Sequence, residues 1–184
     1  MTHSGNDNER ELVRLIQQGD ASAMKTVYCR YIEYLTAVCS RYVIYDDDTR
    51  DVLQDSFIKI FTSVDKFEYR GEGSLKAWMV RIVINESLKF LKKNERFDVI
   101  QYERDLPDAI DEPETDDIPA SIIQNMIRQL PAGYRTVFNL YVFEEKSHKE
   151  IASILNIKES TSASQLHRAK DMLAKKIQEY KSVC

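Results

Sequence analysis

Apolar residues recur every three or four positions along almost the whole chain, which is the spacing that places them on one face of an α-helix. Examples near the N-terminus are Leu12, Ile16, Ala23, Val27, Tyr31 and Leu35. The 184 residues include only 5 glycines and 4 prolines. The frequent tight turns of a β-rich fold need these residues, so their scarcity favours helices. We therefore predict an all-α protein.

One segment interrupts the helical pattern. Residues 98–119 contain three of the prolines, and residues 97–118 carry one basic and nine acidic side chains. By contrast, residues 1–96 are balanced in charge and residues 119–184 have a net charge of +4. Because the acidic composition cannot bury a core, we predict a helical domain at residues 8–97, an acidic flexible linker at 98–119 and a second helical domain at 120–184.

The sequence argues against several classes of protein. Its apolar runs are too short to span a membrane, and the polar N-terminus lacks the apolar segment of a signal peptide, so we expect a cytoplasmic protein without membrane insertion. The three cysteines form no CxxC pair and no Cys/His metal spacing. No phosphate-binding glycine loop, nucleophile elbow or paired His/carboxylate motif occurs. We therefore expect no enzyme activity, no metal and no cofactor.

Residues Ser147–Leu173 have the spacing of a helix-turn-helix motif. Ser147 and Glu150 have the spacing of a capping box at the start of a helix. Asn156 occupies the sharp turn, where a left-handed backbone is required and asparagine is tolerated next after glycine. In such a motif the N-terminal part of the second helix enters the major groove of DNA.

Small polar residues at the start of the second helix are the candidates for reading DNA. We place them on the outward face, where serine and threonine can bond to bases or phosphates and glutamine can pair with adenine. With the basic residues nearby, the predicted contacts are Lys149, Thr161, Ser162, Ser164, Gln165, Arg168 and Lys170. A hairpin used only for packing is the alternative, and the basic charge of this domain favours DNA binding.

The first domain carries a mixed stripe at helical spacing. Its members are Trp78, Arg81, Asn85 and Lys89, and Ser74 is the expected N-cap of their helix. An aromatic ring beside cations suits single-stranded nucleic acid, where base stacking and phosphate contacts act together. On spacing alone, however, Trp78 is equally well explained as a core residue with the polar residues on a solvated surface.

A second stripe in the first domain precedes this helix. In the segment DVLQDSFIKIF, the residues Asp51, Gln54, Asp55 and Ile58 share one face. The helix is expected to begin at Asp51, after a polar break at residues 46–49. This face either docks on a protein or is merely exposed to solvent.

Five stretches together resemble the extracytoplasmic-function (ECF) sigma factors of bacterial RNA polymerase. In chain order they are GDASAMKTVYCRY, DDDTRDVLQDSFIKIF, SLKAWMVRIVINESLKFLKK, LPAGYRTVFNLYVFEEKSHKEIASIL and TSASQLHRAKDML. The resemblance covers about residues 10–96 and 121–180. Each stretch alone is moderately specific, whereas all five in this order around a linker of this length are strongly indicative.

The resemblance implies two helical domains, called σ2 and σ4. The helix with Asp51, Gln54, Asp55, Ile58 and Phe61 would dock on the clamp helices of the polymerase β′ subunit. The loop FEYRGEGS, which begins at Phe67, would open the promoter −10 element and hold its unpaired strand together with the residues beside it, Trp78, Arg81, Asn85 and Lys89. The second domain would bind the β flap through its apolar surface and the −35 element through its helix-turn-helix. The linker would run toward the RNA channel, and an anti-sigma factor usually controls such proteins.

Some positions depart from the family pattern. Glycine is frequent in the family where this chain has Asn156 and Ser160, and a basic residue is frequent at Ala163. Loss of that cation should remove about one phosphate contact and make DNA binding less dependent on salt. Two rival functions remain at this point: a regulator with a ligand-sensing first domain, and a sigma-like decoy that binds polymerase without promoter activity.

Overall fold

The computed structural model describes residues 4–94, 114–115 and 117–183. These residues form helices and loops without a strand, so the all-α prediction is confirmed. The chain divides into two compact units, residues 1–93 and 94–184. Most of the predicted acidic linker lies outside the described residues.

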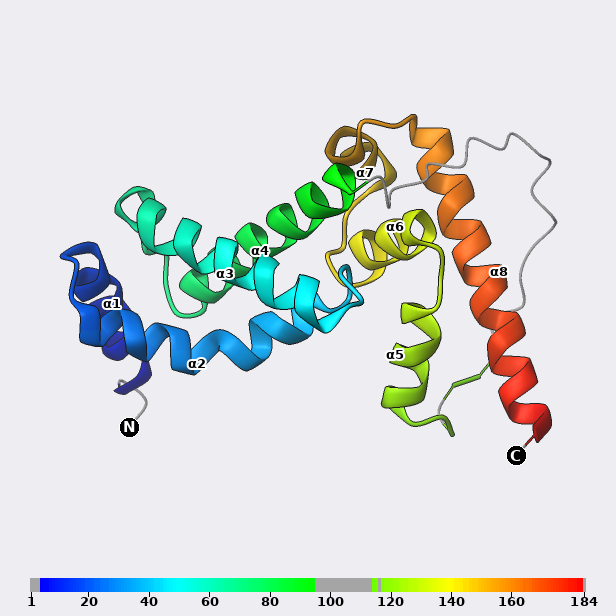
Figure 1. The fold of residues 1–184 in the computed structure, drawn as a ribbon, viewed down its shortest axis with the longest axis horizontal. Coiled ribbons are helices and arrows are strands. Elements are labelled where there is room, and N and C mark those ends of the chain that lie inside the picture. Colours follow the sequence, from blue (N-terminus) through cyan, green and yellow to red (C-terminus); the bar gives the residue numbers. More distant parts are fainter. Residues whose placement is uncertain (1–3, 95–113, 116, 184) are drawn as a thin grey trace. The chain divides into compact units, whose positions relative to one another are not determined.

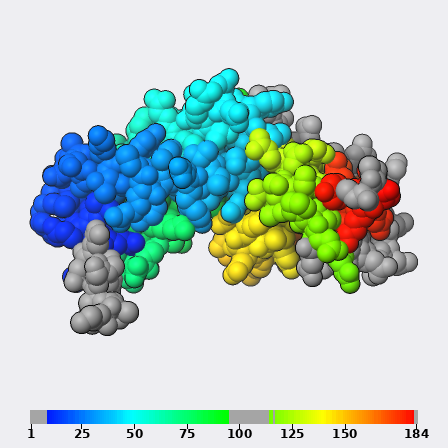
Figure 2. Space-filling view, turned by 90° about the horizontal axis from the view of Figure 1, so that it is seen from below, coloured from blue at the N-terminus to red at the C-terminus, as the bar shows by residue number. Residues whose placement is uncertain are grey.

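The first unit is built from four α-helices and one short 3₁₀ helix. They are α1 (Ser4–Gln17), α2 (Ala21–Cys39), α3 (Asp46–Ser63), η1 (Val64–Lys66) and α4 (Ser74–Lys93). Helices α2, α3 and α4 pack against one another, and α3 runs opposite to its two neighbours (Figure 1). Helix α1 packs on one end of α2, as the dark and mid-blue side chains show (Figure 2).

Two helix starts in this unit show how the sequence sets local structure. Asp20 caps α2, because its side chain accepts a hydrogen bond of 2.7 Å from the backbone N–H of Ala23, as its position after a glycine suggests. Helix α3 begins at Asp46, five residues before the predicted start at Asp51. Three aspartates in its first turn interact favourably with the positive end of the helix dipole, so the presumed polar break is helical.

The described residues of the second unit form the helices α5 (Ala120–Arg128), α6 (Ala132–Val142), α7 (His148–Leu155) and α8 (Glu159–Val183). Helix α8 packs against the other three. Its core includes Ile118, which is 6% exposed and clusters with Met126, Tyr134 and Ala169. The packed core of this unit thus includes a residue on the linker side of the predicted boundary at residue 120.

A buried arginine joins α5 to α6. Arg135 is 2% exposed, and its Nη1 donates hydrogen bonds to the carbonyl oxygens of Arg128 (3.2 Å) and Leu130 (2.8 Å). These carbonyls lie at and just beyond the C-terminal end of α5, where backbone acceptors lack partners within the helix. Burial, followed by the charge of Arg128, lowers the pKa of Arg135 to about 10. The guanidinium therefore stays charged at neutral pH.

Candidate nucleic-acid interfaces

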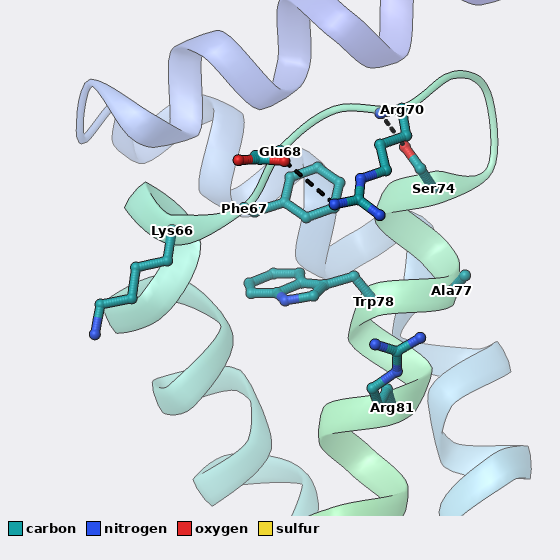
Figure 3. A pocket seen from close by; sticks show the side chains of 8 residues that line it. All are labelled: Lys66, Phe67, Glu68, Arg70, Ser74, Ala77, Trp78 and Arg81. Carbon is teal, nitrogen blue, oxygen red and sulfur yellow. Dashed lines mark hydrogen bonds and ion pairs between the residues drawn. The ribbon is translucent and has the colours of Figure 1, made fainter.

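A pocket of 480 Å³ opens in the first unit between α4 and the loop that precedes it. Its lining residues are Lys66, Phe67, Glu68, Arg70, Ser74, Ala77, Trp78 and Arg81 (Figure 3). Three members of this set, Phe67, Trp78 and Arg81, belong to the predicted −10 contacts. The family resemblance indicated the loop that contains Arg70, but no pattern in the sequence indicated a pocket or the position of Lys66 in it.

Aromatic rings form one wall of the pocket. The ring centroids of Phe67 and Trp78 lie 5.0 Å apart, with an angle of 38° between the ring planes. Phe67 is buried, at 8% exposure, whereas Trp78 is half-buried. In Figure 3 the indole lies between the Phe67 ring and the Arg81 guanidinium. Trp78 is therefore not a fully enclosed core residue. The buried ring of Phe67 packs against its indole.

The charge of the pocket is mostly positive. Lys66, Arg70 and Arg81 contribute cations, and Glu68 contributes the carboxylate. Arg70 and Glu68 form an ion pair of 3.2 Å, but both side chains are about four-fifths exposed, so the pair is weak and easily exchanged. A pocket with an aromatic wall and a cationic rim suits an unstacked base with its flanking phosphates.

The loop over the pocket, residues 67–73, depends on glycine. Gly71 and Gly73 have φ of +118° and +82°, a region that side chains disfavour. The Ser74 hydroxyl donates to the carbonyl of Gly71 (2.6 Å) and accepts from the N–H of Arg70 (3.3 Å). The prediction that Ser74 acts as the N-cap of α4 is therefore not supported by these bonds, because its hydroxyl serves the loop instead.

The rest of the predicted α4 stripe continues away from the pocket. Arg81, Asn85 and Lys89 are all exposed. Lys89 lies 3.4 Å from the buried carboxylate of Glu86, which also accepts a 2.6 Å hydrogen bond from Lys59 of α3. Burial alone would raise the pKa of Glu86, but the two lysines outweigh it and hold that pKa below its ordinary value. Sequence reasoning missed Glu86, which orients one of the predicted DNA contacts.

The predicted docking stripe of α3 is accessible. Asp51, Gln54 and Asp55 are exposed, and Ile58 is 55% exposed although it is apolar. Phe61 is only partly exposed, and its ring lies 6.0 Å from that of Phe57. An exposed isoleucine among acidic and amide groups is consistent with a protein-docking surface.

The local geometry predicted for the helix-turn-helix is confirmed. The Ser147 side chain accepts from the N–H of Glu150, and the Glu150 carboxylate accepts from the N–H of Ser147, which together form the capping box. Asn156 ends α7 with φ 57° and ψ 51°, the left-handed conformation. Helices α7 and α8 pack together beyond this turn.

Two of the predicted DNA contacts in α8 are buried, so the prediction that they face outward is wrong. Ser162 is fully buried, and its hydroxyl lies 3.0 Å from Nδ1 of His148. Gln165 is 1% exposed, and neither atom of its amide has a hydrogen-bond partner. Helix α8 packs against α6 as well as α7, so more of its circumference is covered than a two-helix pattern suggests.

The other predicted contacts of this motif remain accessible. Lys149 is exposed, and Thr161, Ser164, Arg168 and Lys170 are partly exposed. The Ser164 hydroxyl donates to the carbonyl of Thr161 at 3.0 Å, and its oxygen can still accept a hydrogen bond. Ala163, the position that departs from the family pattern, is also partly exposed. A surface of hydroxyls and cations therefore remains at the start of α8.

Neither a membrane span nor a metal centre is found in the described residues. Among the helices of residues 4–94 and 117–183, none combines the length and the hydropathy that a membrane-spanning segment requires. Among the same residues, no group of three or more His, Cys, Asp or Glu side chains is arranged to hold a metal ion.

Comparisons with known proteins agree with the two-unit fold. Residues 27–97 match the family model for sigma-70 region 2, and residues 120–173 match that for sigma-70 region 4. The chain is 30% identical to the ECF RNA polymerase sigma-E factor of Haemophilus influenzae, over 92% of this chain and 95% of that protein. It is 29% identical to the RNA polymerase sigma-H factor of Pseudomonas aeruginosa, over 94% and 95% of the two chains.

A solved structure also resembles this chain. It is that of CnrH in complex with the cytosolic domain of CnrY, which matches with a TM-score of 0.50 and 19% identity over 92% of this chain and 97% of CnrH. At this identity the likeness concerns the fold alone. The matches of both regions, in the expected order, and the identity to the Haemophilus protein over nearly its full length lead to one conclusion: the chain belongs to the ECF sigma factors of bacterial RNA polymerase.

Proposed function

We propose that this sigma factor directs core RNA polymerase to specific promoters and that its first unit captures the unpaired strand of the −10 element. The pocket beside α4 is the observation that carries this proposal. Trp78 offers a ring on which a base can stack, and Arg81 lies next to it. Exposed Asn85 and Lys89 continue along the same helix, in a suitable place for the following phosphates.

The α3 stripe supplies the proposed contact with the polymerase. Asp51, Gln54 and Asp55 would pair with basic and polar groups of the β′ clamp helices, and Ile58 would be buried in that interface. An exposed apolar residue surrounded by polar ones is the usual arrangement at the centre of a protein interface. Phe61 lies at the edge of the stripe and would contribute only in part.

The second unit would bind the −35 element. Lys149, Arg168 and Lys170 would contact phosphates, and the hydroxyls of Thr161 and Ser164 would reach base edges or phosphates. Ser162 and Gln165, buried beneath this surface, would shape it without touching DNA. The proposed site for the β flap is an exposed apolar cluster near the end of α6, made of Tyr141, Val142 and Phe143.

An anti-sigma factor is the proposed regulator. The structural neighbour CnrH was solved with the cytosolic domain of CnrY, and we propose a partner of that kind for this chain. The same proposal makes the protein a cytoplasmic transcription factor with no catalytic activity of its own and no cofactor. Its relatives are named as sigma factors.

Promoter-dependent run-off transcription tests this function. The purified protein is added to core RNA polymerase with fragments of the genomic DNA, and the start sites are sequenced. We expect initiation at a small set of promoters that share −10 and −35 sequences, and no such initiation by core enzyme alone. If the protein binds core polymerase but no specific start site appears, it is a decoy and the proposal fails.

A further inference from the structure

Helix α1 holds one end of the pocket loop through a buried carboxylate. Glu9 is 6% exposed and lies beneath the junction of the loop with α4. Its two oxygens accept hydrogen bonds from the N–H groups of Gly73 (3.1 Å) and Leu75 (3.2 Å). A carboxylate at a helix N-terminus satisfies amides that have no partner in the helix and interacts favourably with the helix dipole. Glu9 therefore caps α4 from another helix.

The same helix holds the other end of the loop. The side-chain amide of Gln17, two turns along α1 from Glu9, donates to the carbonyl oxygens of Val64 (3.1 Å) and Phe67 (2.9 Å). Val64 is the first residue of η1, and Phe67 follows the last residue of η1 and begins the loop. One helix outside the pocket thus bonds the backbone on both sides of residues 67–73.

We infer that Glu9 and Gln17 are positioning residues for −10 recognition, which hold the pocket loop in the shape that receives an unpaired base. The inference rests on the proposed function of the pocket. Neither side chain lines the pocket, so both would act through the loop. They would leave the docking surface on α3 unchanged.

The composition of the loop explains why anchors are needed. Gly71 and Gly73 give it a wide range of backbone conformations, which must be lost when a base is bound. Phe67 and Arg70 belong to this loop and line the pocket, so any movement of its backbone moves the pocket wall. Anchors that fix the loop beforehand remove this cost from binding.

The experiment compares two anchor variants with two matched controls on α1. The anchor variants are Glu9→Gln and Gln17→Ala. The controls are Glu11→Gln, whose side chain is exposed and paired with Arg14, and Gln18→Ala, which is also exposed and bonded to Arg14. Each protein is assembled with core polymerase. The probe is fluorescent single-stranded DNA that carries the −10 element of a promoter mapped by run-off transcription, together with versions substituted at each base.

We expect each anchor variant to bind the −10 strand about tenfold more weakly, which is the size of one charged hydrogen bond lost at Glu9 or of two neutral ones lost at Gln17. Discrimination should also fall at one base position, while affinity for core polymerase stays as in the wild type. The controls should change neither quantity. Gln17→Glu should be worse than Gln17→Ala, because it would place a carboxylate against two carbonyl oxygens. A merely structural role would lower thermal stability without changing base discrimination.

The outcomes separate this inference from the function on which it rests. If Trp78→Ala weakens strand binding but folded Glu9→Gln and Gln17→Ala retain full affinity and discrimination, the anchors have no positioning role and the inference is wrong. If Trp78→Ala also binds normally, the pocket does not hold the strand and the proposed function fails first. Should Glu9→Gln not fold, the half-buried Gln17 decides the question by itself.

Discussion

Helices α4 and α8 each carry a row of polar side chains, but the two rows lie in different surroundings. On α4 the side chains of Arg81, Asn85 and Lys89 are exposed. On α8 the side chains of Ser162 and Gln165 are buried between helices. A long charged side chain is rarely buried without a partner, whereas a serine or an uncharged amide can be enclosed at moderate cost. Charge therefore indicates the surface of a helix more reliably than polarity does, except where a partner is close, as for the buried Glu86 with its two lysines.

The largest expected effect concerns the aromatic end of the α4 row. Trp78→Ala should weaken binding of holoenzyme to the single-stranded −10 element by roughly ten- to a hundredfold, because it removes the stacking of one base. Fluorescence anisotropy with the labelled strand measures this loss. Tyr45→Ala is the control, since Tyr45 is also an exposed aromatic residue, at 61%, and does not line the pocket. Equal losses in both variants would refute a specific role for Trp78.

The charged part of the α8 row gives the next effect. Arg168→Ala should reduce affinity for duplex −35 DNA by about tenfold and lower the slope of log affinity against log salt by about one. The matched control is Lys175→Ala, further along α8, where the lysine is exposed and paired with Asp171. A loss of affinity with an unchanged salt slope would show that Arg168 does not contact a phosphate.

A cation added at Ala163 of α8 tests whether this partly exposed position faces DNA. Ala163→Lys should raise affinity for −35 DNA a few-fold at low salt and steepen the salt dependence by about one contact. Filter binding or anisotropy over a range of salt concentrations gives both quantities. If both remain as in the wild type, this partly exposed position faces away from DNA.

Replacement of Gln165, the buried amide of α8, tests whether this residue serves packing and not DNA binding. Gln165→Leu removes two polar atoms without hydrogen-bond partners and puts an apolar side chain of similar size in their place. We expect the free energy of unfolding to stay the same or rise by about 1 kcal/mol, with unchanged affinity for −35 DNA. Thermal unfolding and DNA binding are measured on the same preparation. A loss of DNA affinity in a stable variant would return Gln165 to the DNA-contacting surface.

The smallest effect concerns the carboxylate beneath the α4 row. Because the pKa of Glu86 is below its ordinary value of 4.5, its ionised form stabilises the fold above that pH, and this contribution is lost as pH falls through the lowered pKa. Glu86→Gln should therefore be about 1 kcal/mol less stable than the wild type at pH 7. The difference should disappear in strong acid. If the difference in stability between Glu86→Gln and the wild type is the same at every pH, Glu86 acts through packing alone.

The residues that could be predicted from the sequence share one property: their partners are nearby in the chain. Asp20, the capping box of Ser147 with Glu150, and the left-handed Asn156 all depend on contacts within a few residues. The burial of Gln165 depends instead on where a third helix packs. The capping of Leu75 by Glu9 spans 66 residues. Helical periodicity carries no information about either, so the anchors and the pocket required the structure.

Arg135 restricts which residues can be accepted at the junction of α5 and α6. Burial brings its pKa down to about 10, which still leaves the side chain ionised in the cell. A lysine starts from a lower ordinary pKa, near 10.4, so the same burial would leave part of its population neutral at physiological pH. It would also offer a single nitrogen in place of a planar fork. We expect natural variation at this position to avoid lysine even though the exchange preserves formal charge.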